Sequence, residues 1–392
     1  MKYKKNCTVC GSSKTDVFVE IASLPVNCNV LLSSKEDAAS ALTGDMALGF
    51  CSSCGHIFNS TNMVDQPDYT RDYENSLHFS PLFQDYARGL ATKLIERYEL
   101  YGKVIVEIGC GKGDFLNLIC ELGDNKGIGF DPTYHAVRDE NNENGKITYI
   151  TDYYSKKYAW AGGDMIICRH VLEHLDSPRE FLKGLRENIG ERLGTKIYFE
   201  VPNAYYILKE RSYWDIIYEH SSYFSKGSLK LLFNSTGFEI LTISDSFDGQ
   251  FLYIEAKPVE KAIDFKVPES ILSKLKEEVA AFAYKYRLKI VSWNTVLKNI
   301  DAHKLRAVVW GSGSKGAAFL NTLRTRSSID YVVDINPHKH GKYIPVTAQK
   351  IVNPEFLISY KPELIIVMNS IYIEEIWKAI KEMKLNVKVL TA

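Results

Sequence analysis

The stretch EIGCGKGDFL, at 107–116, constrains the fold of this chain more than any other part of the sequence. It follows the strand-like run 103–106 and leads into a helical pattern. Glycines at Gly109, Gly111 and Gly113 allow the backbone to turn tightly and to approach a bound molecule closely. The pattern indicates a chain that bends around a ligand at the end of a strand.

Short apolar runs alternate with amphipathic helical patterns on both sides of this loop. The strand-like runs lie at 104–108, 127–130, 164–168 and 196–201. Such alternation predicts a doubly wound parallel sheet, and the runs FEILTISDSF and FLYIEAKP are typical of antiparallel strands that complete one. A helix is expected after the run at 164–168, with Ser177 as its cap and Pro178 at its first position. After a long helical pattern over 267–300 the alternation of strands and helices restarts.

Four of the eight cysteines form two Cys-x-x-Cys pairs, Cys7 with Cys10 and Cys51 with Cys54, each followed by glycine. Two thiolates at this spacing can hold one side of a tetrahedral Zn²⁺ ion. The 40 residues between the pairs exceed the usual spacing, so an inserted segment must bring them together. A closed four-cysteine shell leaves no open position, which predicts a structural zinc ion. His56 is an outside candidate ligand, and unrelated or redox-active thiols are the alternative.

Composition excludes several classes of protein. Lys and Arg total 48 and Asp and Glu total 48, so a dominant nucleic-acid partner is not expected. No window approaches eighteen apolar residues, and the first residues show no secretory signal, so we expect a cytoplasmic protein without a membrane partner.

These patterns predict an α/β protein in four segments. Residues 1–70, which are mostly short polar segments, form a small zinc module, and residues 71–260 form a central Rossmann-like domain. Residues 261–300 form a helical connector, and residues 301–392 form a smaller Rossmann-like domain.

The glycine loop at 107–113 lacks the Lys-Ser/Thr ending of a P-loop and the G-x-G-x-x-G spacing of a dinucleotide site. Its pattern, E-x-G-x-G-x-G, resembles motif I of class I S-adenosylmethionine-dependent methyltransferases. The resemblance implies that Glu107, Gly109, Gly111 and Gly113 hold the methionine moiety of S-adenosylmethionine.

The resemblance continues in order along the chain. Asp131, 24 residues after Glu107, falls where the family binds both ribose hydroxyls, and Asp152 falls where the family contacts the adenine amine. Arg169 and His170 belong to the segment that lines the methionine end of the cofactor in the family.

Candidates for acid–base chemistry lie in WDIIYEHSSYFS, at 214–225, where Tyr218, Glu219 and His220 are consecutive. Histidine titrates nearest neutral pH, and aromatic burial can raise a carboxyl group toward the range of a general base. A solvated turn with a capping acid is the alternative. Earlier in the chain, His174 follows His170 by four residues and would share a face with it if the segment were helical.

Domain order and motifs together resemble the zinc-containing C-methyltransferases that act on nucleotide-linked keto-deoxysugars. The resemblance implies that Tyr218, Glu219, His220 and His174 line the active site. It further implies that His220 or Glu219 removes a proton from the carbon beside a ketone while the other orients it. The resulting enolate then attacks the methyl group.

Two segments depart from the pattern of this family. In DYENSLHFSP, Tyr73, His78 and Ser80 stand in place of a loop rich in tyrosine and serine. In FDGQFLYIEA, Gln250 stands where the family has another polar contact. Both segments are expected to contact the acceptor.

The second glycine loop is GSGSKG, at 311–316, and it fits G-x-G-x-x-G. Gly311, Gly313 and Gly316 can place backbone amides at a phosphate, and Lys315 adds positive charge. Simple packing of helix on strand is the alternative. The family architecture favours binding of the diphosphate of the substrate, while a second dinucleotide site, for which Asp334 would contact the ribose, is disfavoured.

The sequence thus predicts an S-adenosylmethionine-dependent methyltransferase that C-methylates a nucleotide-activated keto-sugar, with a small-molecule substrate and an open oligomeric state. O- or N-methylation of another metabolite is the alternative within the enzymes. A zinc-bearing binding module with a degenerate methyltransferase fold is the alternative outside them.

Overall fold

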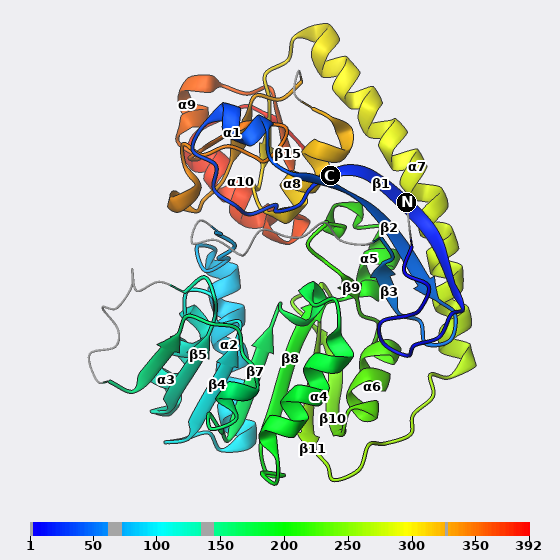
Figure 1. The fold of residues 1–392 in the computed structure, drawn as a ribbon. Helices are drawn as coiled ribbons and strands as arrows, with labels where there is room; N and C mark the ends of the chain where they lie inside the picture. The colour runs from blue at the N-terminus through cyan, green and yellow to red at the C-terminus, as the bar shows by residue number, and fades with distance from the viewer. Residues whose placement is uncertain (1–2, 62–72, 135–144, 326–327) are drawn as a thin grey trace.

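The computed structural model describes residues 3–61, 73–134, 145–325 and 328–392. In these ranges the strands form three sheets, of seven, four and five strands. The seven-stranded sheet occupies the lower part of Figure 1 and the five-stranded sheet the upper part. This architecture confirms the predicted α/β fold class.

The seven-stranded sheet has the order β10-β11-β8-β7-β4-β5-β6. Five strands are parallel, while β10 and β11 are antiparallel and close one edge, as predicted. The chain leaves β4 toward β5 on one side, and β7 lies on the other side, so a ligand crevice is expected at the carboxyl end of β4. The strands are β4 (Val104–Ile108), β5 (Lys126–Phe130), β6 (Ile147–Ile150), β7 (Met165–Arg169), β8 (Lys196–Pro202), β10 (Phe238–Ser246) and β11 (Phe251–Pro258).

Helices cover both faces of this sheet (Figure 1). The helix after β7 begins at Pro178 with Ser177 as its cap residue, as the sequence predicts. The helices are α2 (Pro81–Tyr98), α3 (Asp114–Gly123), α4 (Pro178–Ile189), α5 (Ala204–Glu210) and α6 (Lys226–Ser235). Short 3-10 helices lie at η2 (Lys156–Tyr158), η3 (Leu172–His174) and η4 (Tyr213–Asp215).

The N-terminal segment forms more regular structure than its polar sequence predicts. Two long strands, β1 (Thr15–Pro25) and β2 (Thr43–Cys51), pair antiparallel around a short helix, α1 (Lys35–Ala39). The short β3 (Ile57–Asn59) follows β2, and it pairs with β9 (Ser222–Tyr223) from far along the chain. The four-stranded sheet is therefore built from two distant parts of the sequence.

The C-terminal domain is a parallel sheet with the order β14-β13-β12-β15-β16. Its strands are β12 (Ala307–Trp310), β13 (Tyr331–Val333), β14 (Lys350–Val352), β15 (Leu364–Val367) and β16 (Lys388–Thr391). Its helices are α8 (Ser314–Leu323), α9 (Phe356–Tyr360) and α10 (Ile373–Glu382), with 3-10 helices η5 (Pro337–Lys339) and η6 (Ser370–Tyr372).

One long helix, α7 (Glu269–His303), contacts all three parts. Its Phe282 packs on Phe18 of β1 and on Tyr213 of the central domain, and its Trp293 packs on Phe319 of α8. These aromatic contacts belong to one buried apolar cluster that extends through the three parts, so the parts share a core.

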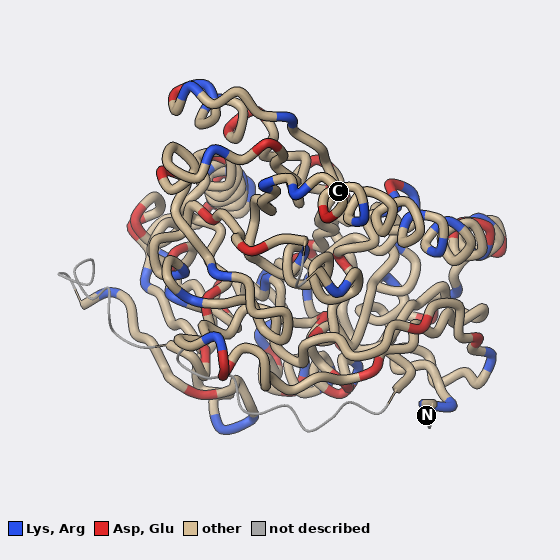
Figure 2. Tube along the Cα trace, turned by 90° about the horizontal axis from the view of Figure 1, so that it is seen from above, with Lys and Arg blue, Asp and Glu red and all other residues tan. Residues whose placement is uncertain are grey.

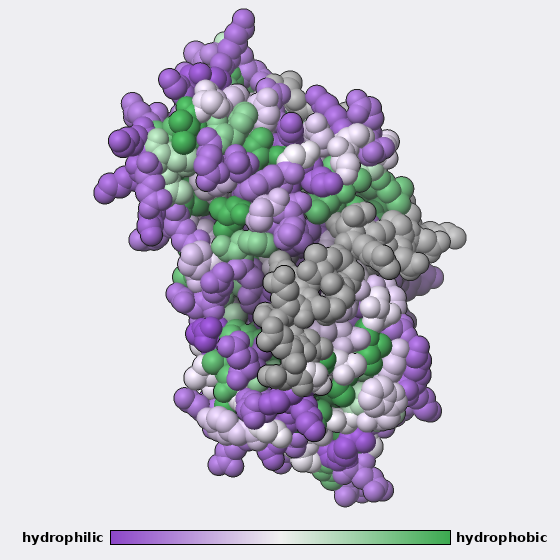
Figure 3. Space-filling view, turned by 90° about the vertical axis from the view of Figure 1, so that its left-hand side faces the viewer, coloured by the Kyte–Doolittle hydropathy of each residue, from purple (hydrophilic) through white to green (hydrophobic). Residues whose placement is uncertain are grey.

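Charged residues of both signs are interspersed along the chain in Figure 2. Figure 3 shows hydrophobic residues in small groups among hydrophilic ones on one face. Among the helices of the described residues, none combines the length and the apolar composition that crossing a membrane requires.

Candidate active site

The first glycine loop joins β4 to α3 at the predicted crevice. Gly109 and Gly113 have φ angles of +73° and +84°, a left-handed region that side chains disfavour. A Cβ atom on Gly109 would lie 2.1 Å from Val171 Cγ2, and one on Gly113 would lie 2.3 Å from the hydroxyl oxygen of Tyr149. Glycine is thus required at both positions, by conformation and by space.

Asp131, at the end of β5, holds this loop. Its Oδ2 accepts a hydrogen bond from the Gly111 amide at 2.9 Å, and its Oδ1 accepts from the amide and hydroxyl of Thr133 at 2.8 Å and 2.6 Å. The carboxylate is partly exposed beside the loop. This position fits the predicted contact with the ribose, which stays a prediction.

Glu107 is a buried carboxyl group, only 3 % exposed, directly before the loop. Its Oε2 has no hydrogen-bond partner among the described residues. Burial raises the pKa of Glu107 to about 8, although the charge of Arg169 opposes the shift. A cationic ligand group at this carboxyl group would relieve the cost of its burial, so the residues present fit the ammonium group of S-adenosylmethionine.

Two further predicted cofactor residues, Arg169 and His170, contact the buried carboxylate of Glu200. Arg169 Nε donates to Glu200 Oε1 at 3.1 Å, and His170 Nε2 lies 3.2 Å from the same oxygen. Burial lowers the pKa of His170, but the nearby carboxylates of Glu173 and Glu200 raise it to about 9. His170 has a φ of +55° and lies outside the short helix η3, so it does not share a helical face with His174.

Asp152 lies just beyond β6, at the carboxyl edge of the sheet. Its Oδ2 accepts hydrogen bonds from Lys157 Nζ and, at 2.6 Å, from the hydroxyl of Tyr158. These two bonds lower the pKa of Asp152 to about 2. The adenine contact expected of Asp152 stays a prediction.

Glu219 and His220 lie between η4 and β9, and the structure places them in different surroundings. Glu219 is fully buried. Its Oε2 accepts a hydrogen bond from the hydroxyl of Tyr73 at 2.6 Å, and its Oε1 accepts from the amide of Cys28. Glu219 is not among the residues that line the adjoining cavity, whereas His220 is.

His220 carries a buried ring nitrogen, Nδ1, without a hydrogen-bond partner among the described residues. Burial lowers the pKa of His220 well below its ordinary value, and the charges of His174 and His170 lower it further. The imidazole is therefore neutral near pH 7 and retains a lone pair that can accept a proton.

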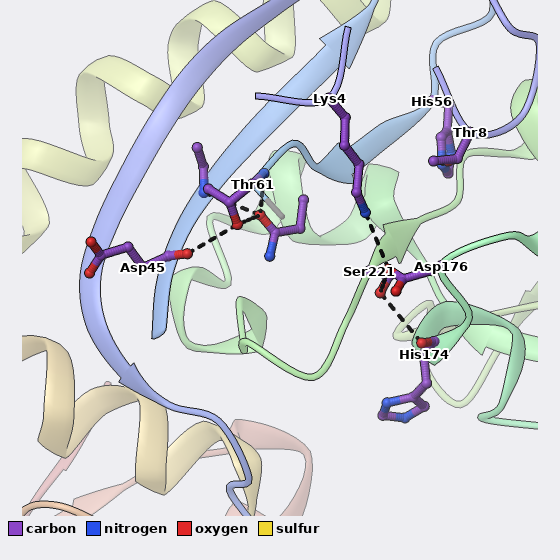
Figure 4. A network of polar contacts seen from close by, with 10 residues as sticks. Lys4, Thr8, Asp45, His56, Thr61, His174, Asp176 and Ser221 are labelled. Carbon is purple, nitrogen blue, oxygen red and sulfur yellow. Dashed lines mark hydrogen bonds and ion pairs between the residues drawn. The ribbon is translucent and has the colours of Figure 1, made fainter. Parts of the chain in front are cut away.

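His174 lies against His220, with ring centroids 4.9 Å apart. Its Nδ1 lies 3.1 Å from the backbone oxygen of Glu219, and because a carbonyl oxygen only accepts, Nδ1 must carry the proton. Figure 4 shows the main chain of His174 held from the other side by Ser221, which also contacts Asp176, while the imidazole points away from both.

Tyr218, the third predicted catalytic residue, packs in the apolar core with 1 % exposure. A Cβ atom on Gly44 of β2 would lie 2.3 Å from its ring, so the ring lies directly on the N-terminal sheet. Tyr218 is absent from the cavity lining.

A cavity of about 330 Å³ lies between the central and C-terminal domains. His220 lines one wall, and the second glycine loop, with Gly311, Gly313, Lys315 and Gly316, lines another. The cavity thus brings together two predicted regions that lie about ninety residues apart in sequence, at 220 and 311.

Polar groups of the C-terminal domain surround the second loop. Asp334 accepts from the amide and hydroxyl of Ser312 at 2.9 Å and 2.5 Å. Lys315 Nζ donates a hydrogen bond to Asp215 Oδ2 of the central domain at 2.8 Å, and Lys339 Nζ lies 4.0 Å from Asp334. All four of these charged side chains line the cavity.

The other residues predicted to contact the methyl acceptor lie partly at the cavity and partly away from it. Ser80, the cap of α2, donates to Glu375 at 3.0 Å, and Gln250 exchanges hydrogen bonds with Asn369, so both bridge the domains at the cavity. Tyr73 binds Glu219 instead, and His78 packs edge-on against Phe83 without lining the cavity.

Sequence reasoning missed the residues that connect Glu219 to the other domains. Asn29 Nδ2 contacts the hydroxyl of Tyr73 at 3.5 Å and Ser314 Oγ at 3.2 Å, next to the amide of Cys28 that binds Glu219. No local motif marks Cys28 or Asn29. Asp215 lies within the aromatic segment WDIIYEHSSYFS. Its charge among apolar residues is the sequence feature that could have identified it as a site residue.

The four paired cysteines converge, as predicted. Cys7 Sγ lies 3.6 Å from Cys54 Sγ and Cys10 Sγ lies 3.6 Å from Cys51 Sγ, and all four sulfurs lie within 4.8 Å of one another. All are free thiols, so they could hold a metal ion. His56 is not part of this group.

His56 is instead a buried ring that contacts Phe58 and Phe224. Its Nε2 contacts Thr8 Oγ1 at 3.2 Å (Figure 4), and burial lowers its pKa to about 3.

Models of known protein families match two segments of the chain. A family model described as "Methyltransferase domain" matches residues 83–243, and one described as "C-methyltransferase C-terminal domain" matches residues 271–388. The C-methyltransferase NovU of Streptomyces niveus is 23 % identical over 389 residues, covering 94 % of this chain and 90 % of the relative.

Solved structures of methyltransferases resemble part of the chain. Magnesium protoporphyrin IX methyltransferase from Synechocystis PCC 6803, with bound S-adenosylmethionine, is 16 % identical, with a TM-score of 0.34, over 45 % of this chain and 80 % of that one. An S-adenosylmethionine-dependent methyltransferase from Aquifex aeolicus is 14 % identical, with a TM-score of 0.34, over 43 % and 89 %.

The two family matches, the similarity to NovU along nearly the whole chain, and the glycine loop on a doubly wound sheet agree. The chain is a class I S-adenosylmethionine-dependent C-methyltransferase.

Proposed function

We propose that this enzyme transfers a methyl group to the carbon beside the ketone of a nucleotide-linked keto-sugar. The observation that carries the proposal is the shared cavity, in which a neutral imidazole and a glycine loop with a lysine face the same space. The similarity to a C-methyltransferase supports transfer to carbon.

His220 is the general base in this proposal. A proton beside a ketone is a weak acid, so the base must reach the carbon in a site from which water is excluded. His220 lines the cavity and has a ring nitrogen without a hydrogen-bond partner among the described residues. Both carboxylate oxygens of Glu219 instead accept hydrogen bonds, and Glu219 does not line the cavity. Glu219 then acts as the positioning residue for the segment, not as the base.

The proposed reaction consists of a proton transfer followed by a methyl transfer. His220 takes the proton from the carbon, and the electron pair of the C–H bond moves into the enolate of the acceptor. S-adenosylmethionine, when bound, supplies a methyl group already activated on a sulfonium. With that molecule bound, the enolate carbon would bond to its methyl group as the carbon–sulfur bond breaks, and the sulfur would keep the electron pair, so the transfer would balance without an added oxidant. Glu107 and Asp131 would hold the amino-acid and ribose parts of that molecule.

The far wall of the cavity fits the nucleotide part of the acceptor. The loop at 311–316 opens α8, whose first amides carry partial positive charge, and Lys315 and Lys339 add two cations. Asp215 and Asp334 accompany these cations, so an entering diphosphate competes with two carboxylates for them. This competition favours an acceptor with two or more negative charges.

We further propose that Zn²⁺ occupies the four-cysteine cluster. Four thiol sulfurs within 4.8 Å of one another match the donor set of a structural zinc site. All eight cysteines are free thiols, which fits a reducing cytoplasmic setting.

The acceptor atom can be tested with deuterium placed beside the ketone of candidate nucleotide sugars. C-methylation must exchange one deuteron for the methyl group, which mass spectrometry detects in the product. Retention of all the label in a methylated product would show O- or N-methylation and overturn the proposal.

The base can be tested with His220→Asn. We expect turnover and deuterium loss to fall together by about 10²–10⁴-fold, the range for loss of a general base, while the affinity for S-adenosylmethionine is retained. His303→Asn on the exposed end of α7 is the matched control and should behave as wild type. Full turnover in His220→Asn would remove His220 from the mechanism.

A further inference from the structure

Three side chains beside the cavity form a second group with the composition of a metal site. Glu173 and His174 come from η3, and His220 comes from the segment before β9. One ligand atom from each side chain lies within 4.8 Å of the other two. A carboxylate and two imidazoles are a common set for a borderline divalent ion with an open position.

Two of these side chains carry buried acceptor atoms without a partner among the described residues. Glu173 is 1 % exposed, and its Oε2 accepts no hydrogen bond, while Nδ1 of His220 is also buried and unpartnered. Buried polar atoms are nearly always paired, because leaving one unpaired costs free energy. Two side chains with unpaired buried polar atoms, whose ligand atoms lie within 4.8 Å of each other, favour a cation between them.

The third side chain is oriented as a metal ligand would be. The Nδ1–H group of His174 donates to the backbone oxygen of Glu219, so Nε2 is the ring nitrogen that would coordinate a metal ion. Ser221 binds the backbone oxygen of His174 from the opposite side, and the imidazole points away from that contact (Figure 4). The ring is therefore fixed before any ligand binds.

We propose that Glu173, His174 and His220 bind a divalent transition-metal ion such as Zn²⁺ or Co²⁺, separately from the four-cysteine cluster. Two imidazoles disfavour Mg²⁺ and Ca²⁺, which prefer oxygen ligands. The fourth position faces the cavity that His220 lines and is filled by water or the acceptor.

This binding has a consequence that rests on the proposed role of His220 as base. A metal ion at the site occupies a ring nitrogen of His220 and holds the imidazole, so the ring no longer accepts a proton from carbon. Free Zn²⁺ or Co²⁺ then inhibits methyl transfer reversibly, in competition with proton abstraction.

Binding can be measured without turnover. Zinc-loaded enzyme titrated with Co²⁺ should take up one further equivalent, with visible absorption typical of nitrogen and oxygen ligands and no thiolate charge-transfer band. Glu173→Gln should weaken this binding at least about tenfold, the scale of losing an interaction at a metal site. Glu180→Gln, an exposed carboxylate on α4, is the matched control and should bind as wild type.

Wild-type protein provides a measurement that does not depend on how the variant folds. In the Co²⁺ form, two imidazole N–H resonances should show paramagnetic shifts in the proton spectrum. Absence of a further equivalent in wild type, or binding that persists unchanged in Glu173→Gln, would overturn the metal site.

Inhibition provides the second measurement. Co²⁺ should lower turnover at the concentration that saturates the absorption change, and a weak chelator that leaves the cysteine-bound ion in place should restore it. Saturated binding with unchanged or raised turnover would overturn the inhibitory consequence and the base role of His220, while the site itself would stand. These outcomes distinguish a failure of the metal site from a failure of the base role of His220.

Discussion

Glu219 and His220 are adjacent in the sequence, yet the fold gives them different surroundings. The carboxylate is enclosed by Tyr73 and the Cys28 amide, while the imidazole faces the cavity. The residue types alone predict that one of the two is the base, and the surroundings of each side chain are the reason that we propose His220 for this role and Glu219 for positioning. The same holds for Tyr218, whose ring packs in the core.

Glu219→Gln should lower kcat without displacing the acid limb of the pH profile, because His220 remains the titrating base. Tyr73→Phe removes the other half of the same hydrogen bond, so the two changes should be non-additive, with a coupling of about 0.5–3 kcal/mol in the transition state. Steady-state kinetics over a pH series measures both quantities. An acid limb that moves in Glu219→Gln would identify the carboxylate as the base.

If Glu107 holds the ammonium group of the cofactor, as predicted, cofactor binding should depend on pH. Its pKa of about 8 means that the carboxyl group is mostly protonated near pH 7 in the free enzyme, whereas an ammonium ion beside it favours the ionised form. Cofactor binding must then release a proton, so the affinity should rise as the pH increases toward about 8 and should level off above it.

Calorimetry in buffers of different ionisation enthalpy measures this proton release. Glu107→Gln should bind weakly and without the pH dependence. An affinity in wild type that does not change between about pH 6 and 8 would contradict the assignment of Glu107 to the ammonium group.

At the scale of elements, the N-terminal segment that carries the paired cysteines shares a sheet with β9, which follows Glu219 and His220. Cys51 and Cys54 flank the turn that leads into β3, β3 pairs with β9, and β9 begins two residues after His220. The Asn59 amide donates to the backbone oxygen of Ser221, and Lys4 pairs with Asp176. Figure 4 shows Lys4 and Ser221 converging on Asp176 beside His174.

Removal of the metal from the cysteines should therefore abolish turnover while S-adenosylmethionine still binds. The cofactor crevice belongs to the seven-stranded sheet, which contains no strand of the zinc module. Chelation in the presence of reductant, followed by cofactor titration and a turnover assay, separates the two properties. Full turnover of the metal-free protein would show that the module does not position His220, and joint loss of both properties would show general unfolding.

At the scale of the whole molecule, the cavity exists because three parts share one core. The long α7 and the apolar cluster hold the C-terminal domain over the carboxyl edge of the central sheet. Hydrogen bonds between Gln250 and Asn369, and the ion pair between Lys315 and Asp215, cross the join. We therefore expect acceptor binding at this join to depend on both domains.

Lys315→Met should raise the KM for the acceptor at least about tenfold, the effect of one lost charge-assisted contact, and should leave the cofactor affinity unchanged. The exchange Lys315→Asp with Asp215→Lys restores an ion pair across the join but reverses the charge beside the second glycine loop. We expect this double variant to remain impaired. Recovery of the wild-type KM would show that Lys315 only holds the domains together.

Local patterns in the sequence determined a large part of this protein. Periodicity of apolar residues identified most strands of both α/β domains and several of their helices, because each element must bury one face. The short strands β6 and β14 and the helices α5, α6 and α9 were not predicted. The spacing of glycines and acids at 107–131 predicted a cofactor loop, and two Cys-x-x-Cys pairs predicted a metal cluster, whose four sulfurs the structure brings together. The family comparisons confirmed the class of enzyme.

The tertiary structure alone decided how these parts make a site. The pairing of β3 with β9, the enclosure of Glu219 by Tyr73 and Cys28, and the ion pair of Lys315 join residues that are far apart in sequence. Such contacts leave no periodic pattern in the sequence, because they depend on which surfaces meet when separate segments share a core. A given side chain could also pair with many others of similar chemistry, so its partner cannot be read from its neighbours in the sequence.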